Sequence, residues 1–359
     1  MFISGMDQFQ TFVQPAKNLF STRALNSHNK HKHSNTKILA QRFESVTIYE
    51  RNQVPSTFAP TSVDLTTNGP STDLYSVTDL DDFISSEIQP DSSFLAGTSQ
   101  SVDHLVTLLQ HNVPARLRPS RVIKGGSLGK GTAVKGKSDI DMTLIMSKYS
   151  NVRDLVRDMP DILSELEESL QHVPEISVDG KTRHAVQISF GESSVDILPA
   201  VDVTKEITLD EVYRKMTGSD ASVKDFYSAS LAPLQTELVR NLPTKVKSLI
   251  RLIKYWNKEK VKPMLLSRCP TSYLYEVIIM DRWVKTGRPD SFDMTRAAHD
   301  VLTSLKNNRD FKILTTELAK YDRRVADIRA ETYIMDPCNP TNDLYNSRFW
   351  NWDGVSYVA

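Results

Sequence analysis

Hydrophobic and polar residues alternate along residues 139–146, and this period of two predicts a β-strand. Ile140 and Met142 fall on one face of that strand, whereas Asp139 and Asp141 fall together on the other. Short apolar runs predict three more strands, over residues 121–123, 185–190 and 194–198. We therefore expect the middle of the chain to form a mixed, mostly antiparallel β-sheet.

Apolar residues recur at helical spacing over much of the remaining chain. In the first half, helices are expected to begin at Thr78, with an acidic first turn, and to run over residues 101–110 and 155–170. After about residue 203 the pattern is mostly helical, with helices expected over residues 245–260, 272–286, 295–307 and 312–321. The fold class is therefore α+β. We expect two lobes, a sheet-containing lobe over 77–202 and a helical lobe over 203–359, with a cleft between them.

Residues 1–76 differ from the rest of the chain because they are rich in Ser, Thr, Asn and Gln and keep no helical or strand period. Such a composition predicts a disordered, low-complexity leader. The first 43 residues hold a single acid, Asp7, which leaves a transit peptide as an alternative, although no Arg-rich amphipathic helix accompanies it.

The overall composition is that of a folded protein, since 39% of the 359 residues are hydrophobic and 25% are charged. The formal net charge is zero, which argues against a uniformly basic surface but leaves local patches open. The sequence holds no apolar run of about 18 residues, so we expect no membrane partner. Cys269 and Cys338 cannot form a disulfide framework or supply a zinc site, and they suit a reducing, cytoplasmic location. The sequence indicates no oligomeric state.

A glycine-rich segment precedes the strand that carries the two acids, and it reads Gly125-Gly126-Ser127-Leu128-Gly129-Lys130-Gly131-Thr132. Its glycines permit tight turns and a close approach of the backbone to a ligand. Loops of this kind present N–H groups to phosphate oxygens. The segment is not a Walker A loop, because Lys130 is followed by Gly131 rather than by Ser or Thr.

Three acids follow this segment. Asp139 and Asp141 share a strand face, and Asp196 belongs to the apolar run 194–198. Adjacent carboxylates repel unless a cation lies between them, and Mg²⁺ or Mn²⁺ is the natural partner of oxygen ligands near a triphosphate. Three carboxylates on neighbouring strands can hold two ions ~3.5–4 Å apart, which drives nucleotidyl displacement. Alone, the pair Asp139 and Asp141 would be explained as a solvated strand edge, and Asp196 as a turn cap. The glycine-rich segment, the pair and the later strand acid, in this order, favour catalysis.

The order Gly-Ser, then Asp-x-Asp, then a strand Asp resembles the polymerase-β-like nucleotidyltransferase superfamily. The longer string GGSLGKGTAVKGKSDID resembles the 2′-5′-oligoadenylate synthetase family more specifically. The resemblance extends from about Leu80 to the C-terminus. It includes the segments VDILPA (195–200), KSLIRLIK (247–254), SY with a later Glu (272–276), DPCNPTN (336–342) and NWDG (351–354).

This resemblance implies a role for each matching residue. Asp139, Asp141 and Asp196 would be the catalytic residues and would bind two metal ions, and Asp196 would also act as the base toward an acceptor 2′-hydroxyl. Nucleotide contacts would come from Gly126, Ser127, Lys130, Arg251, Lys254, Ser272 and Tyr273. Of these, Tyr273 would stack on an adenine. Lys124 and Lys245 match positions that contact double-stranded RNA.

The function implied by the resemblance is that of a double-stranded-RNA-responsive, metal-dependent nucleotidyltransferase. It would polymerise ATP into 2′-5′-linked oligoadenylates with release of pyrophosphate, as a second-messenger synthesis in antiviral innate immunity. Residues 240–262 fit this implication, with eight basic residues against one acid. The alternatives are a cyclic-dinucleotide synthase of the cyclic GMP-AMP synthase-like type and a non-catalytic RNA-binding sensor. The need for RNA, the linear or cyclic form of the product and its base preference stay open at this point.

Overall fold

The computed structural model describes residues 79–136, 139–191, 193–265, 268–346 and 348–359. The leader predicted for residues 1–76, and with it the transit-peptide alternative, lies outside the described residues. Within the described part of the chain, every helix is too short or too polar to cross a lipid bilayer.

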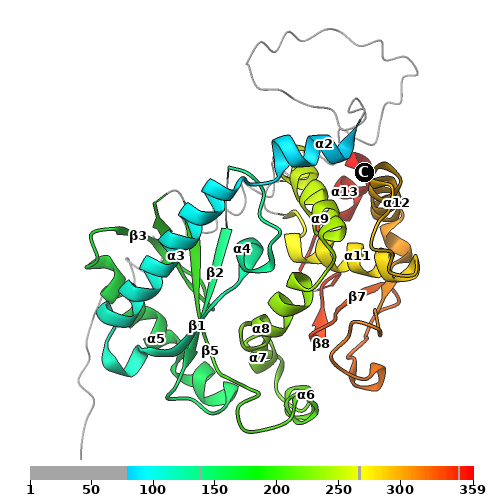
Figure 1. The fold of residues 1–359 in the computed structure, drawn as a ribbon. Helices are drawn as coiled ribbons and strands as arrows, with labels where there is room; N and C mark the ends of the chain where they lie inside the picture. Colours follow the sequence, from blue (N-terminus) through cyan, green and yellow to red (C-terminus); the bar gives the residue numbers. More distant parts are fainter. Residues whose placement is uncertain (1–78, 137–138, 192, 266–267, 347) are drawn as a thin grey trace, which may run out of the picture. The chain divides into compact units, whose positions relative to one another are not determined.

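The first half of the described chain contains a five-stranded mixed sheet (Figure 1). Its strands are ordered β1 (Pro119–Lys124), β2 (Asp139–Met146), β5 (Ser193–Ala200), β4 (Val186–Phe190) and β3 (Ile176–Lys181). β2 and β5 run parallel, and the other neighbouring pairs run antiparallel, so the predicted mixed sheet is confirmed. The sequence did not reveal β3, because only Ile176 and Val178 among its six residues are strongly apolar.

Two long helices, α3 (Ser92–Asn112) and α5 (Val152–Gln171), pack on one face of this sheet (Figure 1). Leu105 of α3, Leu155 of α5 and Ile140 of β2 are each no more than 2% exposed and belong to the same hydrophobic cluster. Burial of the apolar side chains of this cluster supplies the main stabilising free energy of the sheet and its helices.

Helix α3 begins nine residues before its predicted start at Ser101, so that predicted start is wrong. The helix begins at Ser92, where the Asp91 side chain accepts a hydrogen bond from the backbone N of Phe94 at 2.7 Å. Residues 92–100 hold few apolar positions, so their helical structure is stabilised by this cap and by continuity with the buried turns that follow.

The second half of the described chain is mainly helical. Its long helices are α8 (Tyr227–Arg240), α9 (Thr244–Trp256), α11 (Ser272–Lys285) and α12 (Met294–Lys306). Their apolar faces form a second hydrophobic cluster, which includes Ile250 of α9 and Ile278 of α11, both fully buried. The helices expected from residues 245, 272 and 295 are thus confirmed. The boundary near residue 202 between the two expected lobes stays a prediction.

A small three-stranded sheet, β6 (Lys312–Ile313), β7 (Tyr333–Asp336) and β8 (Asn339–Asp343), lies beside these helices. The helix predicted over 312–321 is therefore wrong. Its first two residues pair in parallel with Tyr333 and Ile334, and a pairing between distant segments overrides the local helical spacing.

The remaining described elements are short. They are α2 (Leu80–Phe83), α4 (Gly126–Lys130), α6 (Leu209–Thr217), α7 (Ala221–Lys224), α10 (Lys262–Leu265) and α13 (Trp352–Val358), with π-helical turns at Ile84–Ile88 and Asn257–Val261 and 3₁₀ turns at Ala115–Leu117, Asn308–Asp310 and Arg323–Val325.

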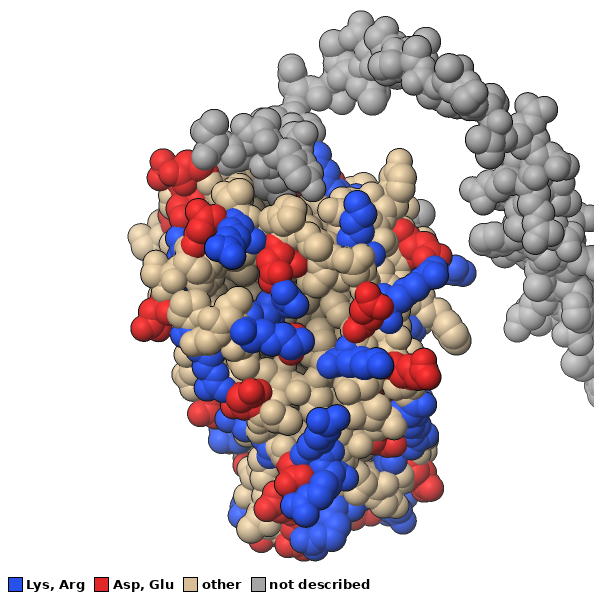
Figure 2. Space-filling view, turned by 90° about the vertical axis from the view of Figure 1, so that its right-hand side faces the viewer, with Lys and Arg blue, Asp and Glu red and all other residues tan. Residues whose placement is uncertain are grey.

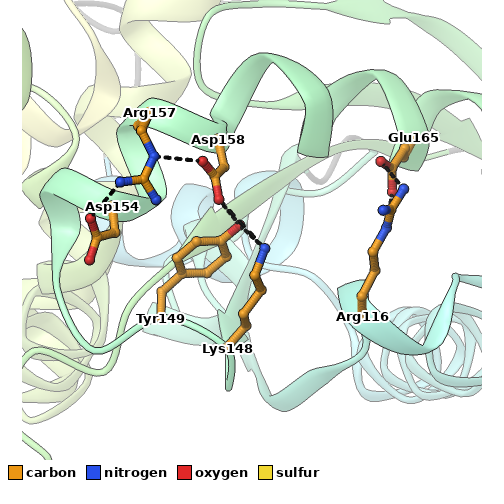
Figure 3. Close-up of polar contacts among 7 residues, drawn as sticks. All are labelled: Arg116, Lys148, Tyr149, Asp154, Arg157, Asp158 and Glu165. Atoms are coloured by element: carbon orange, nitrogen blue, oxygen red, sulfur yellow. Dashed lines mark hydrogen bonds and ion pairs between the residues drawn. The ribbon is translucent and has the colours of Figure 1, made fainter.

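A polar network fastens the segment after β2 to α5 (Figure 3). The Tyr149 hydroxyl and Nε of Arg157 each donate to Asp158 at 3.0 Å. These hydrogen bonds, first that from Arg157, lower the pKa of Asp158. Arg116 pairs with Glu165 on the next turns of α5. The network lies at the carboxyl end of β2, away from the end that carries the two acids, and we assign it a structural role.

Candidate active site

Two of the predicted catalytic acids lie side by side on parallel strands. Asp141 of β2 is in register with Asp196 of β5, and Asp139 is in register with Ser194. In-register residues on adjacent strands project from the same face, so the carboxylates of Asp141 and Asp196 share one face of the sheet. The backbone of Asp139 is described, whereas its side chain lies outside the described part of the structure.

This pair of carboxylates fits a hard divalent cation. Like charges placed directly opposite each other destabilise a sheet, and a cation bound between them removes that cost. Carboxylate oxygens are the ligands that Mg²⁺ prefers, and Mn²⁺ accepts the same donors. Among the described side chains, no cluster of three or more His, Cys, Asp or Glu residues is placed to hold a metal ion, so a three-carboxylate site requires Asp139.

The glycine-rich segment lies against the strand that carries these acids. The backbone N of Gly125 donates to the carbonyl oxygen of Asp141 at 2.7 Å, and α4 follows at once. The segment expected as a turn is thus a short helix, closed by a hydrogen bond from Thr132 N to Ser127 O at 2.8 Å. A Cβ atom on Gly129 would lie 2.1 Å from the carbonyl oxygen of Lys124, so only glycine fits this close approach.

Arginines from the helical half hold the carbonyl groups of this segment. Nε of Arg240, at the end of α8, donates to Gly129 O at 3.0 Å. Arg251 of α9 donates from Nη2 to Gly131 O at 2.7 Å and from Nε to Ala133 O at 3.2 Å. Nη1 of Arg251 is buried and has no partner among the described atoms, and burial lowers the pKa of this guanidinium. A buried donor left unpaired costs ~1–3 kcal/mol, which an anionic oxygen at this position would recover.

Two lysines share one buried carboxylate beside the same segment. Nζ of Lys130 lies 2.8 Å from Oε2 of Glu276, and Nζ of Lys254 lies 2.6 Å from Oε1. Lys254 also donates to Oγ1 of Thr132 at 3.0 Å. Burial raises the pKa of Glu276, but the two lysines lower it by more and hold it at about 2. Two ammonium groups against one carboxylate leave a net positive charge beside the glycine-rich segment.

Tyr273, which is expected to stack on an adenine, has contacts at its hydroxyl group and at one face of its ring. Its hydroxyl donates to Oδ1 of Asp336 at 2.8 Å, and Nζ of Lys130 lies 4.3 Å from the centre of its ring. Burial raises the pKa of both Tyr273 and Asp336. Because Lys130 covers part of one ring face, a base that stacks here would use the other face. The neighbouring Ser272 begins α11 and is half-buried.

Three side chains at this site received no role from the sequence: Glu276, Asp336 and Gln187. Glu276 is an acid inside the apolar run of α11, and that exception to the pattern is a usable signal. Asp336 is fully buried and also accepts a hydrogen bond from Nε2 of Gln235 at 2.7 Å, a contact between distant segments that no local pattern shows. Nε2 of Gln187 donates to Oδ1 of Asp196 at 3.0 Å, and this contact depends on strand pairing.

The two lysines expected to contact RNA are each paired with an acid from an N-terminal helix. Lys124 of β1 forms an ion pair with Asp103 of α3, and Lys245 of α9 forms one with Asp81 of α2 at 2.6 Å. The 21 residues of α3 include no lysine or arginine. On the side of the molecule that carries α12, basic and acidic side chains are interspersed rather than gathered by sign (Figure 2).

Comparisons with known proteins agree with this arrangement. The family model for the Second Messenger Oligonucleotide or Dinucleotide Synthetase domain matches residues 75–213. The model for 2′-5′-oligoadenylate synthetase 1, domain 2, C-terminus, matches residues 208–359.

Relatives in mouse are 2′-5′-oligoadenylate synthases. Synthase 1A is 28% identical over 319 residues, which cover 78% of this chain and 85% of that protein. Synthase 3 is 27% identical over 303 residues, so the chain is matched over 76% of its length and spans about a quarter, 26%, of that longer protein. A rat relative that is 27% identical over 309 residues is an inactive 2′-5′-oligoadenylate synthase 1B.

A solved structure supports the fold. CdnC from E. coli MS115-1, determined with ATP, is similar with a TM-score of 0.51 at 19% identity, over 77% of this chain and 87% of that one. The two family models together cover residues 75–359 in sequence order. Over the whole of its described length the chain is therefore similar to the 2′-5′-oligoadenylate synthetases, which are nucleotidyltransferases.

Proposed function

We propose that the chain joins ATP molecules into 2′-5′-linked oligoadenylates in a metal-dependent reaction. The observation that carries this proposal is the register of Asp141 with Asp196, next to a glycine-rich segment surrounded by basic side chains. In each step the 2′-oxygen of an acceptor would form a bond to the α-phosphorus of ATP. The bond from that phosphorus to the bridging oxygen would break, and pyrophosphate would leave.

The side chains present suit the separate parts of this reaction. Asp196 would accept the proton of the acceptor hydroxyl. Lys130 and Lys254 would bind the phosphates that become pyrophosphate, and the unpartnered Nη1 of Arg251 supplies another donor. Ser127 and the N–H groups around Gly126 belong to the segment that would hold the donor phosphates. Bound to Asp139, Asp141 and Asp196, Mg²⁺, or Mn²⁺ in its place, would supply positive charge to the reacting phosphate.

Activation by double-stranded RNA is a further part of the proposal. Lys124 and Lys245 supply the charge that phosphate contacts need, because duplex RNA is bound largely through phosphates and 2′-hydroxyl groups. In this structure both lysines are paired with acids, so RNA phosphates would have to displace Asp103 and Asp81. The synthesis would then serve antiviral innate immunity, with the cytoplasm as its expected location.

A cyclic-dinucleotide synthase is the second candidate. It is favoured by the match of residues 75–213 to a domain model described for oligonucleotide or dinucleotide synthetases. The two candidates need the same carboxylates and differ in how the acceptor is placed, so only the product separates them.

A product assay tests these proposals. Purified protein is incubated with ATP, GTP and Mg²⁺, with and without long double-stranded RNA, and the products are digested with a 3′-5′-specific nuclease before mass analysis. Nuclease-resistant linear oligoadenylate that forms only with RNA supports the whole proposal, and the same product without RNA removes the activation. A cyclic or guanine-containing dinucleotide assigns the chain to the second candidate. Absence of product with every ligand contradicts both and revives the non-catalytic RNA-binding sensor.

A further inference from the structure

Asp141, Asp196 and Gln187 form a row across three neighbouring strands, and we call its first two members the row of acids. Asp196 of β5 is in register with Asp141 on one side and with Gln187 of β4 on the other, so the three side chains share one face of the sheet. Nε2 of Gln187 donates to Oδ1 of Asp196 at 3.0 Å. Within the described residues, no other side chain has a hydrogen bond to Asp196.

We infer that Gln187 is a positioning residue for Asp196. An aspartate carboxylate rotates about the bond that joins it to Cβ, and a metal ligand or base works only in a narrow range of that rotation. The amide of Gln187 holds Oδ1, which leaves Oδ2 for a metal ion and for the acceptor hydroxyl. This inference rests on the proposed function and names a residue that acts through Asp196 rather than on the substrate.

The chemistry of an amide suits this task better than that of a charged group. A lysine or arginine at position 187 would neutralise Asp196 and compete with a cation, whereas an acid would add repulsion to a row that already carries two carboxylates. An amide donates a hydrogen bond and leaves the negative charge of Asp196 in place. Neutral hydrogen bonds to ligating carboxylates are the usual way in which proteins orient them.

The residues around Gln187 hold its backbone in place. Its neighbours Val186 and Ile188 are fully buried in the core below the sheet, so the backbone of β4 is fixed at this point. On its other side Gln187 is in register with Gly180 of β3, which carries no side chain. Among the in-register neighbours of Gln187, Asp196 is therefore the one with a side chain that can accept its hydrogen bond.

The test compares Gln187→Met with Ser189→Ala in the full chain. Methionine keeps the length of glutamine but has no donor. Ser189 shares the strand and the face of Gln187, and its hydroxyl donates at 2.8 Å to Asp179, which lies outside the row. For each protein, Mn²⁺ binding in the presence of a non-hydrolysable ATP analogue is measured by calorimetry, kcat and KM for ATP by product formation, and thermal stability by the melting temperature.

Loss of the orienting hydrogen bond should weaken Mn²⁺ binding and lower kcat by about 10- to 100-fold in Gln187→Met. KM for ATP should change little, the melting temperature should shift by no more than about 3 °C, and Ser189→Ala should match the wild type. Gln187→Asn, whose amide is too short to reach Oδ1, should repeat the loss and guards against a folding defect in the first variant.

Two results would count against this inference in different ways. Wild-type affinity for Mn²⁺ and wild-type kcat in both Gln187 variants would overturn the role of Gln187 while the proposed function stands. A wild-type protein that neither binds Mn²⁺ with the ATP analogue nor makes product would contradict the proposed function itself, and the positioning role with it.

Discussion

Nζ of Lys130 lies 2.8 Å from Oε2 of Glu276, and this carboxylate is only 1% exposed. Nζ of Lys254 lies 2.6 Å from the other oxygen of the same group. One acid of α11 thus joins the glycine-rich segment to α9. Because both lysines are proposed phosphate ligands, Glu276 decides where their ammonium groups lie before a nucleotide binds.

Replacing this acid by Glu276→Gln should lower the free energy of unfolding at neutral pH by about 3 kcal/mol, because two buried ammonium groups lose their counter-charge. The pKa of Glu276 is about 2 in the folded chain, below the ~4.3 of an unfolded one. The stabilisation is therefore complete above the unfolded pKa and is lost as the pH falls toward 2. Denaturant unfolding should show the difference between wild type and variant shrink between about pH 5 and pH 3.

Glu211→Gln is a matched control for that experiment. Glu211 forms an exposed ion pair with Lys215 at 3.7 Å, four residues along α6. Its replacement should change the free energy of unfolding by no more than about 0.5 kcal/mol. A difference for Glu276→Gln that stays constant over the whole acid range would show that the charge of Glu276 does not stabilise the fold.

Asp196→Asn and Asp141→Asn should each lower nucleotidyl transfer by more than about 100-fold, because an amide keeps the shape of the side chain but neither carries negative charge nor accepts a proton. Asp179→Asn is the control, since Asp179 lies on β3, which β4 separates from β5, and outside the row of acids. Product formation and melting temperature are measured together. Activity retained in Asp196→Asn would remove that residue from the proposed mechanism.

Gly129→Ala should destabilise the glycine-rich segment and abolish nucleotide binding. The added Cβ would lie 2.1 Å from the carbonyl oxygen of Lys124, so the segment must move away from β1. Gly97→Ala provides the contrast, because a Cβ there meets no atom within 4 Å and the residue lies inside α3. Its effect should be a stabilisation of up to about 1 kcal/mol. Melting temperatures and ATP binding by calorimetry distinguish the two, and equal behaviour would argue against the close approach.

Asp81→Asn should strengthen binding of double-stranded RNA by freeing Lys245 from its ion pair. An RNA phosphate could then bind Lys245 without first displacing Asp81, so the affinity should rise at each salt concentration tested. Asp82→Asn removes the same charge one residue further along α2, where no ion pair with a described lysine forms, and should have less effect. Identical RNA affinity in Asp81→Asn and wild type at each salt concentration would show that Lys245 does not contact RNA.

The sequence by itself determined the elements whose local pattern is strong. Residues 139–146 form a strand, and α9, α11 and α12 begin within one residue of their predicted starts, because each buries a regular apolar face against a core. The period of two along β2 also placed Asp139 and Asp141 on the face opposite the buried Ile140, since successive residues of a strand point to opposite sides.

Only the tertiary structure decided which distant segments meet. The parallel pairing of β2 with β5 brings Asp141 beside Asp196, and the antiparallel pairing of β5 with β4 adds Gln187. The same holds for β6, which pairs with β7 although its local spacing is helical, and for Glu276, whose two lysines come from α4 and α9. A sequence pattern fixes the face on which a residue lies, but the partner across that face is set by how whole elements bury their apolar sides together.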